Sequence, residues 1–429
     1  MRPDSFLGRL QNLPERVPFF YGWVIVGCAV CAAFARQGSA VATLSVFISP
    51  MTTEFGWSRT ALSGAVSAGG VLAALTAPTV GRWVDNHGPR VILSVSAVVI
   101  ALAALALSQV TTLIGFYIAF AIARLTFASP FDIGISGSMA NWFLRLRARA
   151  MSYITLSYTL GLAAMPMAAQ ATMNVFDWRM AWVTIAVLVL VIGALPNFLF
   201  MRRRPEDYGL VPDGAQASPA QSRADGARPE PRYTRAQALR TPSLWLLMGF
   251  SAFLFPCQAG ISLHQAPHLI ESGLSPTVAA AIVSTYSIVA AISGLGYARL
   301  VRVLAIRHCL SLAAMAIAVS AVAMLDVTTF AQAFVAAAAF GIGIGGLLTL
   351  LPVAWADYFG RLNFGAIRGI TLPVQVCSQA IGPILAGVLY DATGSYKLSL
   401  MTFGVLAVIA AVFAFFARPP RFEADNAIG

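Results

Sequence analysis

Ten residues decide the fold of this chain: Gly81-Arg82-Trp83-Val84-Asp85-Asn86-His87-Gly88-Pro89-Arg90. They separate two apolar runs, residues 61–80 and 91–110, and each run has close to the ~20 residues that a helix needs to cross a bilayer. The glycines favour a sharp bend, and the arginines are typical of a cytoplasmic loop. We therefore predict a tight cytoplasmic turn between two membrane helices, with Asp85 as a carboxylate held among arginines.

The overall composition also indicates a membrane protein. Of the 429 residues, 58% are hydrophobic and 10% are charged, whereas about 25% of a soluble protein is charged. The net charge is +11, but most of the 28 basic residues fall in candidate cytoplasmic segments. The exceptions are Arg59, Arg179 and Lys397 on the other side, and Arg36 and Arg124 within apolar runs. This asymmetry follows the positive-inside rule and argues against nucleic acid as a partner.

Twelve membrane spans can be placed along the sequence. They are residues 21–48, 61–80, 91–110, 113–137, 150–172, 180–201, 244–270, 278–300, 309–325, 330–353, 367–389 and 398–416. The first run is too long for a signal-peptide core, so we expect it to remain as an anchor. The even number of spans, with arginines near both ends of the chain, predicts that both termini are cytoplasmic.

The spans form two groups of six. We predict a cytoplasmic segment over 1–20, a six-helix bundle over 21–201, a linker over 202–241, a second bundle over 242–417 and a cytoplasmic tail over 418–429. The linker is rich in Pro, Gly, Ala, Arg and Ser, which predicts a mobile segment. The groups repeat: residues 141–146 match 357–362, Pro166 matches Pro383, and 298–307 is a degenerate copy of the opening stretch. Such repeats are typical of transporters with a site between the halves.

The spacing Gly81-x-x-x-Asp85-x-x-Gly88-x-Arg90 resembles the loop signature of the major facilitator superfamily, where it joins the second and third helices. Residues 20–24, 54–59, 202–210, 382–387, 390–391 and 394–396 resemble the monocarboxylate and oxalate:formate group, especially its bacterial members. The resemblance covers nearly the whole chain. It implies an all-α fold of twelve transmembrane helices in two six-helix pseudo-repeats, acting as a secondary transporter in a bacterial inner membrane.

The family resemblance also implies a role for the opening stretch. Gly81, Asp85, Gly88 and Arg90 would form a conformational gating motif, and the loop would contact the start of helix eleven, near Gly365 and Ala366. A helix N-terminus attracts a carboxylate such as Asp85. Helix ten carries the run Gly341-Ile342-Gly343-Ile344-Gly345-Gly346, for which close helix packing is the default interpretation and a gating bend the alternative.

The sequence carries no catalytic constellation, so we expect no enzyme activity. It has no G-x-x-x-x-G-K-[ST] loop for ATP, and none of its four histidines has the spacing of a metal ligand in a polar cluster. Cys28 and Cys31 form a C-x-x-C on an apolar helix without other soft ligands nearby, which favours packing over metal or redox chemistry. We therefore predict no cofactor and no metal.

Arg36 and Arg124 are the most informative residues. Each lies near the middle of a predicted span, where an arginine costs ~2.5–3.5 kcal/mol on insertion scales. In the resembled family, helices one and four face the central cavity. A guanidinium binds a carboxylate through two parallel hydrogen bonds, so two arginines there suggest an anionic substrate. The alternative is structural pairing with Asp132, which is ~12 Å from Arg124 along the helix axis.

Several uncharged residues and one acid complete the candidate site. Asp132 lies inside a predicted span, so it could carry a proton or pair with an arginine. Repeat alignment places Gln258 opposite Arg36, and His264 follows it within two turns, where it could bind substrate, titrate or form a polar rim. Polar positions on helices five, eight and eleven add Tyr158, Tyr286 and Gln375. Helices eight and eleven lack the charged residues of the animal monocarboxylate and oxalate-type carriers.

These observations predict a transporter that moves a small organic anion, a mono- or dicarboxylate, by alternating access, coupled to protons or to exchange for a counter-anion. We expect it to be a monomer. A drug or cation exporter of the same fold is the first alternative, but it would favour an acid in helix one and a Gly-Pro pair in helix five. Helix five instead reads Gly161-Leu162-Ala163-Ala164-Met165-Pro166. A transporter-like membrane sensor is the second alternative, and a long folded soluble domain would favour it.

Overall fold

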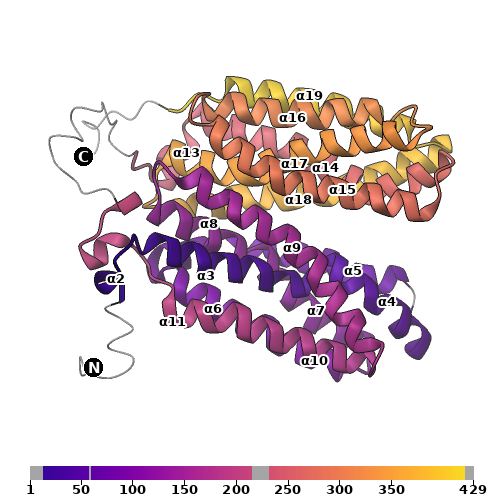
Figure 1. Cartoon of the computed structure of the whole chain (residues 1–429), viewed down its shortest axis with the longest axis horizontal. Coiled ribbons are helices and arrows are strands. Elements are labelled where there is room, and N and C mark those ends of the chain that lie inside the picture. The colour runs from indigo at the N-terminus through magenta and orange to yellow at the C-terminus, as the bar shows by residue number, and fades with distance from the viewer. Residues whose placement is uncertain (1–12, 58, 215–230, 421–429) are drawn as a thin grey trace. The chain divides into compact units, whose positions relative to one another are not determined.

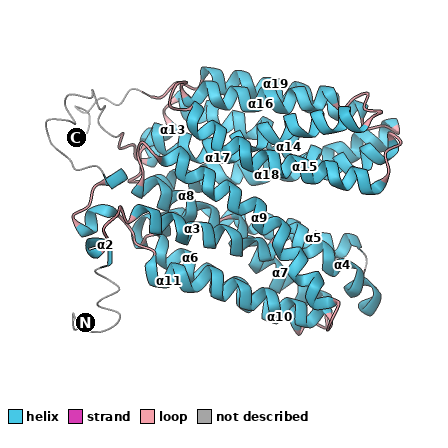
Figure 2. Cartoon of the chain, viewed as in Figure 1, coloured by secondary structure: helices cyan, strands magenta, loops and turns pink. Residues whose placement is uncertain are grey.

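The computed structural model describes residues 13–57, 59–214 and 231–420, and it groups them into two compact units. The first unit holds the described residues before Pro231 together with Gly360–Gly369. The second unit holds Pro231–Phe359 and the described residues from Ile370 onward. Within the described ranges every regular element is a helix, drawn in cyan in Figure 2. The expectation of an all-α fold is therefore confirmed.

The long helices of the first unit follow the order of the predicted spans (Figure 1). They are α3 (Gly22–Ala35) with α4 (Val41–Phe55), α5 (Arg59–His87), α6 (Pro89–Ser108), α7 (Leu113–Ala128) with α8 (Pro130–Trp142), α9 (Arg147–Met173), and α10 (Trp178–Leu188) with α11 (Leu195–Phe200). Short turns at Leu13–Arg16 (α2), Pro205–Tyr208 (η3) and Pro212–Gly214 (η4) flank them.

Among its described residues, the second unit contains six long helices and one short one. They are α13 (Arg235–Leu239), α14 (Pro242–Glu271), α15 (Pro276–Leu300), α16 (Ile306–Ala323), α17 (Phe330–Phe359), α18 (Phe364–Thr393) and α19 (Lys397–Phe416). The first turns of α18, up to Gly369, belong to the first unit. Within the second unit α17 packs against both α15 and α16, and α19 packs against α14 and α16 (Figure 1).

Among the described residues, ten segments are long and apolar enough to cross a membrane. The other two predicted spans coincide with α9 and α15, which have 27 and 25 residues. The sequence of α9 contains hydroxyl side chains such as Tyr153, Thr155 and Ser157, which lower its hydropathy. The structure is thus consistent with the twelve predicted spans and with a multi-pass membrane protein.

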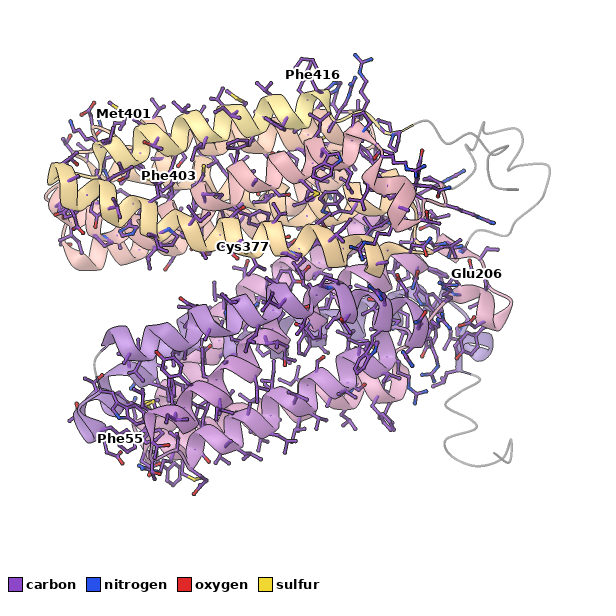
Figure 3. The ribbon with its side chains drawn as sticks, turned by 180° about the vertical axis from the view of Figure 1, so that it is seen from behind. Phe55, Glu206, Cys377, Met401, Phe403 and Phe416 are labelled. Atoms are coloured by element: carbon purple, nitrogen blue, oxygen red, sulfur yellow. The ribbon has the colours of Figure 1, made fainter. Side chains whose placement is uncertain are left out.

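Apolar side chains point outward from both units, as expected of surfaces that face lipid. On α19, Met401 and Phe416 point away from the second unit, whereas Phe403 is buried within it (Figure 3). In the first unit, Ile114 and Leu102 are 74% and 59% exposed. Exposed large apolar side chains of this kind are expected where a helix faces the hydrocarbon of a bilayer.

The glycine run of α17 serves close packing, as the default interpretation predicted. A Cβ on Gly341 would lie 2.5 Å from the carbonyl oxygen of Tyr286 on α15, and a Cβ on Gly343 would lie 2.7 Å from the carbonyl oxygen of Ala313 on α16. Alternating glycines therefore let α17 approach both of its neighbours at backbone distance.

The predicted ten-residue turn is wrong in its length. The helix α5 continues to His87, and α6 begins at Pro89, so Gly88 alone makes the turn. Gly88 has φ of +78°, a conformation that glycine adopts without strain, and the proline that follows favours the first turn of a helix. The residues between Gly81 and His87 include no proline, so nothing among them stops the helix earlier.

The described parts of the predicted linker, residues 202–214 and 231–241, contain short helical turns. The helical turns η3 and η4 lie in its first part, and α13 lies in its last part. The carboxylate of Asp213 accepts hydrogen bonds from the amides of Leu144, Arg145 and Leu146, at 3.1, 2.7 and 3.2 Å. Local hydrogen bonding of this kind does not depend on apolar periodicity, which is why the sequence pattern did not reveal it.

Candidate functional site

The first predicted span is broken in its middle, which the sequence analysis did not predict. A short 3₁₀ turn, η1 (Arg36–Ser39), separates α3 from α4, and Ala40 has an extended backbone. The hydroxyl of Ser39 donates to the Arg36 carbonyl at 3.2 Å, and that of Thr43 donates to the Gln37 carbonyl at 2.7 Å. Such side chains compete with helical hydrogen bonds and stabilise the interruption. Arg36 therefore lies at the break.

A second irregular helix supports this break. The segment between α10 and α11, η2 (Val189–Ala194), is a π-helix, and it packs against η1. A Cβ on Gly38 would lie 3.0 Å from the Val189 side chain, so glycine allows this approach. π-Helical segments are frequent at functional sites. Two irregular segments thus meet next to Arg36.

Arg36 and Arg124 share one aromatic ring. Their guanidinium carbons lie 4.2 Å and 4.3 Å from the ring centroid of Phe127. The two cations are therefore no further apart than the sum of these distances, within reach of one small acid. Phe127 lies one turn after Arg124 on α7, and sequence reasoning missed it because an aromatic residue on an apolar helix carries no distinguishing signal.

Tyr158 on α9 completes the surroundings of Arg36. The guanidinium carbon lies 4.4 Å from the Tyr158 ring centroid, and Nη1 donates to the hydroxyl at 3.4 Å. The helix α9 thus presents Tyr158, one of the predicted site residues, to Arg36. The stem of Arg124 instead packs on α5, where a Cβ on Gly69 would lie 2.5 Å from the Arg124 Cβ.

Asp132, in the first turn of α8, binds two cations. Its Oδ2 accepts from Nη2 of Arg368 at 2.5 Å, and its Oδ1 lies 3.9 Å from Nη1 of Arg36. Both side chains of the shorter pair are shielded, with 18% exposure for Asp132 and 3% for Arg368. Arg368 lies one turn into α18, near the expected start of helix eleven. The sequence analysis treated it as one of the cytoplasmic basic residues and so missed it.

Unlike Arg36 and Arg368, which both contact Asp132, Arg124 contacts no acidic side chain in the described part of the chain. Within the described residues it forms no ion pair and no hydrogen bond, and its buried Nε has no partner. The expected ~12 Å separation from Asp132 agrees with this result. The ring of Phe127 offers an attraction of only ~0.5–2 kcal/mol, so the guanidinium keeps most of its capacity to bind an anion.

The opening stretch makes the contact that its family resemblance implied. The amides of Gly365 and Ala366 donate to Oδ1 and Oδ2 of Asp85, both at 2.8 Å, so the carboxylate caps the first turn of α18. A Cβ on Gly81 would lie 2.0 Å from the Gly365 carbonyl oxygen, which requires glycine there. Arg90 lies elsewhere, and its Nε donates to the carbonyl of Phe198 at 2.8 Å.

Two side chains from neighbouring segments reinforce this contact. Nη2 of Arg203 donates to the carbonyl of Asp85 at 2.7 Å. Arg361 forms an ion pair with Glu206, and its Nη1 donates to the carbonyl of Asn141 at 2.8 Å. The segment 202–210, which resembles bacterial members of the group, thus contacts Asp85 through Arg203. Through Glu206 it also contacts Arg361, which lies just before α18.

The candidates of the second unit have partners of their own. Gln258 accepts from Gln379 at 2.9 Å, and Tyr286 packs edge-on to Phe340 with ring centroids 5.2 Å apart. His264 lies 3.3 Å from both the Tyr396 hydroxyl and the Pro383 carbonyl, beside a cavity of about 10 Å³. Gln375 lies on α18. In the described part of the second unit, the contacts of Gln258, His264 and Tyr286 are thus with uncharged groups.

The whole chain can now be compared with known proteins. A family model described as "Major Facilitator Superfamily" matches residues 25–264 and again 260–428. The chain belongs to the major facilitator superfamily. The double match confirms the predicted internal repeat, and it makes the protein a transporter rather than an enzyme.

Relatives within this superfamily share part of the chain or the fold. Monocarboxylate transporter 2 of Mus musculus is 33% identical over 86 residues, which are 20% of this chain and 18% of that protein. Monocarboxylate transporter 1 of Homo sapiens is 32% identical over 88 residues, also 20% and 18%. The matches thus span less than a fifth of these curated relatives.

Solved structures of the superfamily share the fold over nearly the whole chain. The human organic anion transporter MFSD10 (TETRAN) matches with a TM-score of 0.71 at 14% identity, covering 93% of this chain and 100% of that one. The proton:xylose symporter XylE also gives 0.71 at 14%, covering 93% and 96%.

Proposed function

We propose that this superfamily member transports a small organic anion, a mono- or dicarboxylate, by alternating access. The observation that carries the proposal is Arg124, a guanidinium in a membrane-spanning segment that has no acid partner in the described part of the chain. An arginine at this depth is costly unless a recurrent anion satisfies it. A substrate carboxylate would meet that requirement.

The surroundings of Arg124 favour an anion over a cation. Asp132 is already engaged by Arg368, which leaves Arg36 with a contact of 3.9 Å that a substrate oxygen could replace. The break at Arg36 adds support, because transporters of this kind often bind substrates where membrane helices are discontinuous. A drug or cation exporter would need a free carboxylate here. In this cluster the carboxylate of Asp132 is paired with Arg368, and the guanidinium of Arg124 has no acid partner among the described residues.

The relatives support the same substrate class. The names of the monocarboxylate transporters and of the organic anion transporter state an anionic substrate for those proteins. The test is an uptake screen in proteoliposomes with labelled mono- and dicarboxylates, with and without a pH gradient. Saturable uptake of at least one acid is expected. Binding without uptake would indicate the sensor alternative, and uptake of organic cations would indicate the exporter alternative.

We also propose that Asp132 is the proton-coupling residue. Protonation would weaken its 2.5 Å contact with Arg368 and release a second guanidinium toward the substrate. Asp132→Asn should therefore retain exchange of the anion across the membrane but lose accumulation driven by a pH gradient. Proteoliposome counterflow and gradient-driven uptake measure the two activities separately. Glu54→Gln, which disrupts an exposed pair with Arg179, is the matched control and should retain both. Retained accumulation in Asp132→Asn would remove Asp132 from the coupling step.

We propose that both termini are cytoplasmic and that the protein lies in a bacterial inner membrane. The asymmetry of basic residues supports this orientation, and the resemblance of residues 202–210 to bacterial members of the group supports the location. A cysteine at Ser218, which lies outside the described residues, should react with an impermeant maleimide only after the cells are opened. The measurement uses a variant whose native cysteines are replaced, and a cysteine at Thr328 in the turn before α17 serves as the external control. Labelling of Ser218→Cys in intact cells would contradict the proposed orientation.

A further inference from the structure

A groove on the first unit lies apart from the anion site. It runs between α3 and α9, which pack side by side (Figure 1), and it has a volume of about 500 Å³. Trp23, Gly27 and Val30 of α3 line one wall, and Arg149, Tyr153 and Leu156 of α9 line the other. Every lining residue belongs to one unit, so the groove is a property of that unit alone.

The polarity of the groove changes along its length. Trp23 is the second residue of α3 and Arg149 the third of α9, so the polar end lies where both helices begin. Val30 and Leu156 lie about 10 Å further along their helices, at 1.5 Å per residue, and are apolar. Trp, Tyr and Arg are typical of the membrane–water interface. The groove therefore has an interfacial end and a hydrocarbon end.

The polar end offers a cation that is held in place but not neutralised. Nε of Arg149 donates to the Tyr153 hydroxyl at 3.4 Å, and its guanidinium carbon lies 5.4 Å from the Trp23 ring centroid. Trp23 is itself braced by Phe143, with centroids 5.4 Å apart. Among the described residues Arg149 forms no ion pair, so its terminal nitrogens remain available to an anion.

Gly27 is the feature that the protein's own packing does not explain. A glycine inside a helix is destabilising relative to alanine. Elsewhere in the unit such glycines have a reason, as at Gly193, where a Cβ would lie 2.7 Å from the Ala35 Cβ. A Cβ on Gly27 would meet nothing within 4 Å. The missing side chain instead deepens the groove midway between Arg149 and its apolar end.

We propose that this groove binds an anionic phospholipid. Its phosphate accepts hydrogen bonds from Arg149 and the Tyr153 hydroxyl, and one acyl chain follows the floor past Gly27 toward Val30 and Leu156. The charge and the graded polarity select this occupant, because an anionic lipid is attracted to interfacial arginine and only a lipid also fills the apolar end.

Native mass spectrometry of the delipidated protein tests this site with dioleoylphosphatidylglycerol, dioleoylphosphatidylcholine and sn-glycerol 1-phosphate. Wild type should bind phosphatidylglycerol about ten-fold more tightly than phosphatidylcholine. Both lipids carry the phosphate, but the choline ammonium cancels its net charge beside Arg149. Glycerol phosphate should not bind. Arg149→Gln should remove the preference, and Gly27→Leu should weaken both lipids.

Matched controls are Arg302→Gln, an exposed arginine of the second unit, and Gly296→Leu, an exposed helical glycine whose Cβ would also meet nothing within 4 Å. Both should bind lipid as wild type does. Because the Arg149 side chain is exposed, Arg149→Gln should fold normally even if Gly27→Leu does not. Equal phosphatidylglycerol binding in wild type and Arg149→Gln would overturn the proposal, and so would tight binding of glycerol phosphate.

Discussion

Replacing Arg124 by glutamine is expected to abolish saturable binding of the transported anion while leaving the protein folded and inserted. Glutamine removes the guanidinium that lacks an acid partner within the described chain, and it breaks no ion pair seen there. Stability should therefore change little, whereas the substrate loses a charge-assisted, two-pronged contact. The measurement is ligand-induced thermal stabilisation of purified protein against a panel of carboxylates.

Arg124→Lys separates charge from shape. Lysine keeps the positive charge but loses the planar fork, so binding should weaken by ~1–3 kcal/mol without disappearing. Arg302→Gln removes one exposed positive charge elsewhere and should respond as wild type does. If Arg124→Gln still responded to the same acid at the same concentration, Arg124 would be structural. The anion proposal would then depend on Arg36, and Arg36→Gln would be the next variant.

The large-scale fold could be predicted because it depends on patterns that the bilayer enforces. Helix length, the position of arginines and the repeated stretches at 141–146 and 357–362 are visible in one sequence. The contact of Asp85 with Gly365 and Ala366 was implied by a family motif rather than by local physics. Its geometry explains the motif, because a carboxylate caps two free helix amides.

The details of the candidate site could be predicted only in part. Arg36 and Arg124 stood out because charge in an apolar run is rare. Phe127 and the helix break at Arg36 did not stand out, because an aromatic residue and a Gly-Ser pair are ordinary in membrane helices. Arg368 was missed for another reason: near the end of a span, a basic residue follows the positive-inside pattern, and its pairing with Asp132 is a tertiary contact.

Replacing Asp85 by asparagine is expected to slow turnover strongly, with a smaller effect on anion affinity at equilibrium. Asparagine has one acceptor oxygen for the two amides of Gly365 and Ala366, and its own amide group would face a donor. Loss of one charge-assisted hydrogen bond costs ~1.5–3 kcal/mol. The first turn of α18 should loosen accordingly, and hydrogen exchange at these two amides should rise by about 10- to 100-fold.

Loosening of the first turn of α18 would also affect Arg368, because Arg368 follows Gly365 and Ala366 on the same helix. The cap at Gly365 and Ala366 positions the Arg368 guanidinium against Asp132, which also contacts Arg36. Asp85 is thereby connected to the anion site through one helical turn, and its loss should change how Asp132 exchanges partners during transport. Asp326→Asn, which removes an exposed carboxylate paired with Lys397, is the matched control. If hydrogen exchange at Gly365 and Ala366 and the transport rate were both unchanged in Asp85→Asn, the cap would not govern the conformational step.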